Sequence, residues 1–196
     1  MSKKRVVLGV TGATGAVYAL RALEVLRELE DVETHLVVSD AGVLNVHYEL
    51  HLKRQAFSQN ADVVHRIDDI AATIASGGFR THGMVILPCS MKTLAAVAQG
   101  FGDNLISRAA DVTLKERRPL VVVPREAPLN LAHLRNMVAI TEMGGIIYPP
   151  VPAFYSHPAS VGDLVDETVG RVLGLLGIEV PALAKPWAGL SGAETP

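Results

Sequence analysis

Two short apolar runs in the middle of the chain, Met84–Leu87 and Leu120–Val123, each end in a cluster of polar residues. The segment between them has the apolar spacing of a helix. This alternation predicts two parallel strands joined by a helical crossover. Ligands of open parallel sheets bind at the carboxyl ends of the strands. The residues that follow the two runs, among them Lys92, Arg125 and Glu126, therefore fall where a phosphate-bearing ligand is expected.

The rest of the chain extends the same alternation to about six strands. Further strands are expected at Arg5–Val10, Thr34–Val38, Val63–Ile67 and Gly145–Tyr148. Helices are expected at Ala16–Glu30, Asp68–Ser76 and Ser160–Leu176, with Ser39 and Asp40 able to cap the helix after the second strand. Together these elements predict an α/β fold, a three-layer α/β/α, Rossmann-like, doubly wound parallel sheet. We expect a single domain over residues 1–178 and a C-terminal tail over 179–196, which contains Trp187.

Composition narrows the function classes. Hydrophobic residues make up 49% of the chain and charged residues only 19%, which favours a homo-oligomer that buries part of its surface. A formal net charge of −2 argues against nucleic acid as a partner. No apolar stretch approaches the ~18 residues of a membrane-spanning helix, so no membrane insertion is expected. The single cysteine excludes an internal disulfide, and the first residues lack a secretory signal, so we expect a cytoplasmic protein.

A glycine-containing turn, Gly12-Ala13-Thr14-Gly15, lies between the first strand and the first helix. Its backbone amides and the helix N-terminus attract a phosphate or a polar ring edge. A similar turn opens many nicotinamide-dependent short-chain dehydrogenases, but Tyr18 stands where their third glycine is expected. None of the four tyrosines is followed four residues later by the lysine of the dehydrogenase catalytic pair. A dehydrogenase is therefore not expected, and a tight turn without a ligand stays open as an alternative.

Several basic residues suit phosphate recognition, which uses guanidinium and ammonium donors: Arg108, Lys115, Arg125 and Arg171. Arg108 and Lys115 are seven positions apart, so they are expected near one face of a helix. Arg171 is equally compatible with an ion pair at the edge of the core. Tyr155, in a loop stiffened by prolines, can bind a phosphate or simply pack.

Other polar residues have simpler interpretations. Arg117 and Arg118 end a helix, where we expect solvent or interface charges. Cys89 is expected to be a small buried hydrophobe. Ser90 and Thr93 can bind a ligand as well as cap the helix that begins there. Asp68-Asp69 lacks the further aspartate of a magnesium site, so no metal is expected.

Four motifs together carry a specific resemblance: Pro-Cys-Ser-Met-Lys-Thr at 88–93, Arg-Ala-Ala-Asp-Val-Thr-Leu-Lys-Glu at 108–116, Val-Pro-Arg-Glu-Ala-Pro-Leu at 123–129 and Pro-Ala-Phe-Tyr at 152–155. From Thr11 to Arg171 the chain resembles the flavin prenyltransferases of the UbiX type. These proteins share the flavoprotein fold of the flavin-containing cysteine decarboxylases. They are often labelled 3-octaprenyl-4-hydroxybenzoate decarboxylase or aromatic-acid decarboxylase.

The resemblance implies two sets of site residues. Flavin mononucleotide (FMN) would be held by Gly12, Ala13, Thr14, Ser39, Ser90, Met91, Lys92, Thr93 and Arg125. The phosphate of dimethylallyl monophosphate would be bound by Arg108, Lys115, Tyr155 and Arg171. Glu126, Lys115 and Thr14 are the implied catalytic residues, with Glu126 as the proton shuttle. Thr14 stands where the family usually has serine, so its added methyl group would crowd the flavin edge.

The implied reaction joins the dimethylallyl group to N5 and C6 of reduced FMN as phosphate leaves, without a metal ion. The product, prenylated FMN, would serve a separate decarboxylase, as in ubiquinone biosynthesis. The resemblance also implies a homo-oligomer, typically a dodecamer. Two alternatives stay open: an FMN-dependent decarboxylase of the cysteine decarboxylase-like group, which carries a Pro-Ala-Ser-Ala-Asn-Thr type segment where this chain has residues 88–93, and a non-catalytic flavin carrier.

Overall fold

A computed structural model describes residues 3–183 of the chain. Trp187 and most of the expected tail lie outside the described residues. A parallel sheet of six strands forms the centre of the fold, in the order β3-β2-β1-β4-β5-β6. The strands are β1 (Lys4–Val10), β2 (Val32–Val38), β3 (Val63–His65), β4 (Gly83–Cys89), β5 (Leu120–Pro124) and β6 (Ile146–Ile147). This topology confirms the predicted doubly wound α/β fold.

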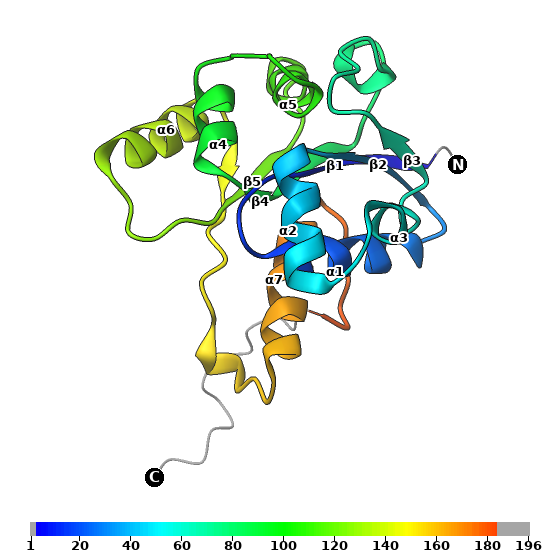
Figure 1. Cartoon of the computed structure of the whole chain (residues 1–196), viewed down its shortest axis with the longest axis vertical. Coiled ribbons are helices and arrows are strands. Elements are labelled where there is room, and N and C mark those ends of the chain that lie inside the picture. The colour runs from blue at the N-terminus through cyan, green and yellow to red at the C-terminus, as the bar shows by residue number, and fades with distance from the viewer. Residues whose placement is uncertain (1–2, 184–196) are drawn as a thin grey trace.

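Helices cover both faces of the sheet and complete three layers (Figure 1). One face carries α1 (Ala16–Arg27), α2 (Asp40–Leu50), α3 (Arg54–Ser58) and α7 (Val161–Leu175). The opposite face carries α4 (Met91–Ala98), α5 (Leu105–Lys115) and α6 (Leu131–Glu142). Each face has its own apolar core, and because both are covered, the central strands read as continuous apolar runs. All seven residues of β4 are buried, for example.

Polar residues begin the helices where the sequence predicts caps. The Ser39 hydroxyl accepts a hydrogen bond from Gly42 N at 3.1 Å, and the Ser90 hydroxyl accepts one from Thr93 N at 3.4 Å. Each bond satisfies one of the amides that the first turn of a helix leaves open. The predicted capping roles of Ser39 and Ser90 are confirmed.

The predicted helix over Asp68–Ser76 is wrong. This segment consists of turns and one short 3-10 helix, η1 (Thr73–Ala75). The Asp69 carboxylate accepts a hydrogen bond from Ala71 N at 3.2 Å, and Asp68 pairs with Arg66. Such local bonds between aspartate side chains and nearby donors compete with helix formation.

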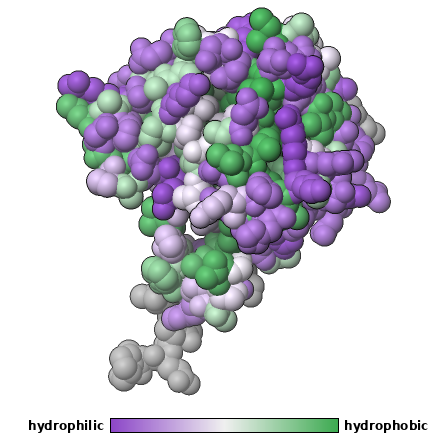
Figure 2. All heavy atoms as spheres, viewed as in Figure 1, coloured by the Kyte–Doolittle hydropathy of each residue, from purple (hydrophilic) through white to green (hydrophobic). Residues whose placement is uncertain are grey.

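Residues 148–160 leave the body of the molecule between β6 and α7 and form a protrusion, which contains a second 3-10 helix, η2 (Phe154–Ser156) (Figure 1). Apolar side chains lie on its surface, as Figure 2 shows. Val151 and Phe154 are 71% and 70% exposed, and Val161 at the start of α7 is 76% exposed. Across residues 3–183, no helix combines the length and the apolar character needed to cross a bilayer.

Candidate functional site

The carboxyl edge of the sheet gathers the polar ends of four neighbouring strands. Strand β1 lies between β2 and β4, and the chain passes from one side of β1 to the other between β3 and β4. This reversal opens a crevice between the loops that follow β1 and β4. The fold therefore places the candidate site at this edge.

Thr11 joins the two loops that border the crevice. This residue is 2% exposed, and its hydroxyl donates to Pro88 O at 2.9 Å. The Thr11 hydroxyl oxygen also accepts a hydrogen bond from Ser90 N at 2.7 Å. Sequence reasoning missed this role, although a hydroxyl residue directly after a buried strand was the available signal.

The glycine turn after β1 is compact because α2 approaches it closely. A side chain at Gly12 would overlap the Ala41 side chain, so only glycine fits there. Gly15 has a φ of 111°, a conformation that glycine adopts without strain. Glu49 of α2 accepts hydrogen bonds from the amides of Gly15 and Ala16, both at 2.9 Å. A carboxylate of this chain thus satisfies the first amides of α1, where the sequence suggested a phosphate, and sequence reasoning missed Glu49.

The residues expected to hold FMN come from four loops that meet at the carboxyl edge. The β1 loop supplies Gly12, Ala13 and Thr14, the β2 loop Ser39, the β4 loop Ser90, Met91, Lys92 and Thr93, and the β5 loop Arg125. Arg125 N donates to Cys89 O at 3.2 Å, which ties the last two loops together. Hydroxyl, ammonium and guanidinium donors suit a phosphorylated ligand, and the exposed side chains of Thr14, Lys92 and Arg125 are accessible to one. The donor set therefore fits FMN.

Cys89 ends β4 beneath this edge but is fully buried. Burial raises the pKa of its thiol far above the ordinary value. A thiol with a raised pKa is a poor nucleophile at neutral pH. The prediction that Cys89 is a buried hydrophobe is confirmed.

Tyr155 and Arg171 lie together around a residue that sequence reasoning missed, Tyr148. Burial raises the pKa of the Tyr148 phenol, and the hydrogen-bonded guanidinium of Arg171 acts in the opposite direction. Tyr155 and Glu167 are also close enough to influence this phenol. Two phenols and one guanidinium thus form a cluster between the protrusion and α7, which can donate several hydrogen bonds to an anion.

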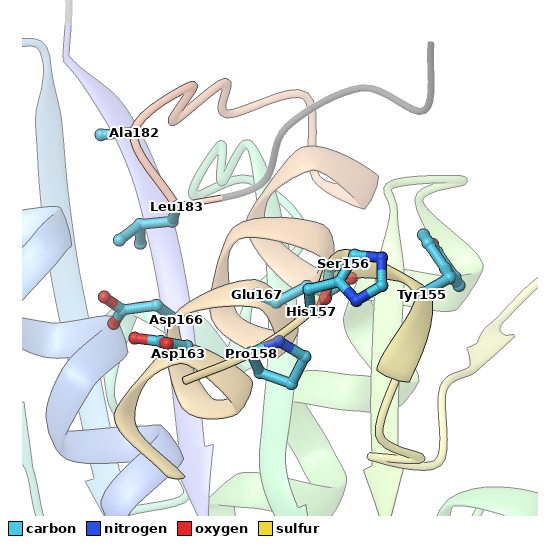
Figure 3. Close-up of a pocket in the computed structure, with 9 residues that line it drawn as sticks. All are labelled: Tyr155, Ser156, His157, Pro158, Asp163, Asp166, Glu167, Ala182 and Leu183. Atoms are coloured by element: carbon cyan, nitrogen blue, oxygen red, sulfur yellow. Dashed lines mark hydrogen bonds between the residues drawn. The ribbon is translucent and has the colours of Figure 1, made fainter. Parts of the chain in front are cut away.

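A cavity of about 290 Å³ opens beside Tyr155 (Figure 3). Asp163 and Asp166 lie at one end and Tyr155 at the other, with Glu167 between them. Three carboxylates disfavour a phosphate in the body of this cavity. Any phosphate bound by Tyr155 must therefore lie on the side of the phenol that faces away from the carboxylates.

Lys115 is separated from the carboxyl edge, whereas Arg108 lies near the start of α5, where Leu105 N donates to Ile67 O just beyond β3 at 2.8 Å. Arg108 and Lys115 lie on one face of α5, as predicted, and both lie beside the turn around Ala75 and Gly77. Arg108 Nε donates to Ala75 O at 3.2 Å, and Lys115 Nζ lies against Gly77. Lys115 ends α5 shortly before β5 begins, while Glu126 follows the end of β5. Because a strand rises about 3.3 Å per residue, Lys115 and Glu126 lie about 20 Å apart along the sheet.

Arg118 is not the solvent or interface charge that the sequence suggested. Its side chain is 14% exposed and donates to Gly77 O at 2.7 Å and to Phe79 O at 3.0 Å. This guanidinium is thus bound by backbone carbonyls that are distant from Arg118 in the sequence. A charge count along the sequence gives no sign of such partners.

Within residues 3–183, no group of three or more histidine, cysteine, aspartate or glutamate side chains is arranged to hold a metal ion.

Comparison with known proteins identifies the class of the fold and site. Residues 1–173 match the family model described as Flavoprotein. A flavin prenyltransferase UbiX from Neisseria meningitidis serogroup B is 54% identical over 162 residues, which span 83% of this chain and 85% of that relative.

Two solved structures are similar over almost the whole chain. A dodecameric FMN-dependent UbiX-like decarboxylase from Escherichia coli O157:H7 is 49% identical, with a TM-score of 0.91 over 94% of this chain and 100% of that chain. AnUbiX (PadA1) in complex with FMN and dimethylallyl pyrophosphate is 49% identical, with a TM-score of 0.92 over 95% of this chain and 98% of that chain. The chain belongs to the flavin prenyltransferase (UbiX) family of flavoproteins.

Proposed function

We propose that this protein transfers the dimethylallyl group of dimethylallyl monophosphate to reduced FMN and so makes prenylated FMN. The observation that carries the proposal is the convergence of the four loops with hydroxyl, ammonium and guanidinium donors at the carboxyl edge. The name of the Neisseria meningitidis relative and the ligands of AnUbiX, FMN and dimethylallyl pyrophosphate, support it.

Reduced FMN, when bound, supplies the nucleophilic ring atoms N5 and C6. The loops after β1, β2 and β4 would orient the flavin, while Arg125 binds its phosphate. The Tyr155 phenol and the Arg171 guanidinium would donate hydrogen bonds to the phosphate that leaves dimethylallyl monophosphate. Such donors stabilise the negative charge that develops on the leaving group. Glu126, which is exposed after the end of β5, would give a proton to the phosphate and later accept one.

Lys115 joins this site only if a second copy of the chain supplies it. A separation of about 20 Å along the sheet keeps Lys115 of one chain away from its own Glu126. We infer a homo-oligomer in which α5 of one subunit faces the carboxyl edge of another. The dodecameric relative from Escherichia coli O157:H7 supports this inference, as do the exposed side chains of Leu131, Leu134 and Val138 on α6.

The product would pass to a separate decarboxylase that uses prenylated FMN as cofactor, and this chain alone would not decarboxylate an aromatic acid. We place the exchange in the cytoplasm.

Incubation with reduced FMN and dimethylallyl monophosphate tests the proposal. Mass spectrometry of the released flavin is expected to find FMN heavier by one prenyl unit. Omission of dimethylallyl monophosphate is the control. Folded, FMN-loaded protein that gives only unmodified FMN would favour the flavin carrier. Release of CO2 from a peptide cysteine would instead favour the decarboxylase alternative.

A further inference from the structure

Four polar side chains form a continuous hydrogen-bonded chain across the first three strands. Arg5 Nε on β1 donates to Glu33 Oε1 on β2 at 2.9 Å. His35 Nε2 lies 3.0 Å from the same Glu33 oxygen, and His35 Nδ1 lies 2.9 Å from His65 Nε2 on β3. His35 is 3% exposed, so the middle of this hydrogen-bonded network is buried, while Arg5 and Glu33 are partly exposed. Nothing in the site described above uses it.

The gap between the two imidazoles of this hydrogen-bonded network can hold one proton but not two. The hydrogen bond from His35 lowers the pKa of Glu33, and the hydrogen bond from Arg5 lowers it further. The Glu33 carboxylate is therefore ionised and can only accept hydrogen bonds. His35 Nε2 therefore carries a hydrogen. One proton then bridges His35 Nδ1 and His65 Nε2. If both rings were fully protonated, two N–H groups would face each other across 2.9 Å, and the bond would break.

His35 connects the two ends of the turn segment that follows β3. His65 precedes this segment, Arg66–Phe79, and is bonded to His35. Phe79 ends the segment and packs edge-on against the His35 ring, with the ring centroids 5.3 Å apart. The Arg5 guanidinium lies 4.5 Å from the centre of the same phenyl ring. Both ends of the segment are thus fixed by contacts with one buried side chain.

The segment between these ends binds basic residues on α5 and directly after it. Ala75 O binds Arg108, and Gly77 O binds Arg118. Lys115 Nζ donates to Glu116 Oε1 at 2.6 Å, and a side chain at Gly77 would meet both members of this ion pair, so the pair lies beside the segment. The segment therefore supplies one hydrogen bond that orients Arg108, which also pairs with Asp111, and it borders the ion pair of Lys115 with Glu116.

We propose that His35 and His65 form a pH-sensitive latch that fixes the segment Arg66–Phe79 and thereby positions Arg108 and Lys115 for the phosphate of dimethylallyl monophosphate. The positioning part rests on the proposed function. His35 and His65 are positioning residues, because they act only through the segment. At acid pH, once both rings are cationic, two N–H groups face each other, so the bond between the rings opens and the segment loosens.

The charged groups around the latch set the direction of its pH dependence. Burial lowers the pKa of His65 below its ordinary 6.5, His35 lowers it further, and Asp69 acts in the opposite direction. Glu33 on β2 is bonded to His35 and Arg5 on β1 is bonded to Glu33, while the apolar Phe79 ring packs against His35. Because the unfolded chain binds this proton more readily than the folded chain, the latch is fully stable above about pH 6.5 and weakens as the pH falls below it.

Hydrogen exchange of the segment between pH 7.5 and 5.5 tests the latch. The variant His65→Gln keeps an N–H donor toward His35 but does not titrate in this range. His133→Gln, a half-buried histidine on α6, is the matched control. After correction for the intrinsic pH dependence of exchange, the segment should exchange on the order of tenfold faster at the lower pH in the wild type and in His133→Gln. The same rate at both pH values in the wild type, or an equal increase in His65→Gln, would refute the latch.

The affinity of the FMN-loaded protein for dimethylallyl monophosphate tests the positioning. The substrate phosphate itself titrates near pH 6, which affects every protein equally. Between pH 7.5 and 5.5 the wild type and His133→Gln should lose roughly threefold more affinity than His65→Gln. An equal loss in all three proteins would show that the segment does not position the phosphate-binding residues. Absence of binding at every pH would count against the proposed function and the positioning, while hydrogen exchange would still decide the latch.

Discussion

Replacement of Thr11 by valine tests whether one buried hydroxyl holds the candidate site together. Thr11→Val keeps the shape of the side chain and removes both hydrogen bonds of the hydroxyl. Ser90 N then loses its acceptor, which costs about 1–3 kcal/mol for a buried amide. Pro88 O loses only one of two donors, because Thr11 N still donates to it at 3.2 Å, and this costs about 0.5–1 kcal/mol. We expect a total loss of about 2–4 kcal/mol in the free energy of unfolding.

Urea unfolding at matched protein concentration measures this loss, since self-association shifts apparent stability. Thr113→Val is the control. The Thr113 hydroxyl is equally buried but donates to Ala109 O inside α5, so the valine variant should lose less than about 1 kcal/mol. Thr11→Val should also weaken FMN binding, because the loops on either side of the crevice are no longer joined. A loss no larger than that of Thr113→Val, with FMN affinity unchanged, would refute this reasoning.

Three further predictions concern single carboxylates. Glu126→Gln should slow prenyl transfer while FMN still binds, because the amide cannot carry a proton, and unchanged turnover would remove Glu126 from the mechanism. Glu49→Ala should lower the free energy of unfolding by about 1–2 kcal/mol, measured by urea unfolding, because the first amides of α1 lose their acceptor; no change would mean that water replaces the carboxylate fully. Hydrogen bonds from the amide of Ala159 and then from Ser160 lower the pKa of Asp163 below its ordinary 3.8, so α7 should stay capped above that pH and fray at its first turn as the pH falls further. Nuclear magnetic resonance of the first α7 amides between pH 5 and 2 measures the fraying, and unchanged spectra would contradict it.

Several features followed from the sequence because they depend on neighbours along the chain. Ser39 and Ser90 cap the helices that begin directly after them, and a cap needs only the next three residues. The helix over Asp68–Ser76 was wrong for a related reason. A helix was expected after the third strand, but the hydrogen bond from Ala71 N to Asp69 stabilises a turn.

Other features depend on distant partners. Glu49 and Arg118 find their partners only because α2 and α5 pack where they do. Tyr148 comes into the site because α7 returns along the sheet and brings Arg171 beside it. The two histidines of the proposed latch meet because β2 and β3 are neighbours in register.

The sequence by itself determined the alternation of strands and helices, and with it the edge of the sheet where polar strand ends gather. That much follows because strand direction and side-chain periodicity are local properties of the chain. Only the tertiary structure decided that Lys115 lies at the amino ends of the strands and Glu126 at their carboxyl ends, although only eleven positions separate them in the sequence. A helix that ends at one edge and a strand that ends at the other keep two nearby residues apart, because each element has a fixed rise per residue.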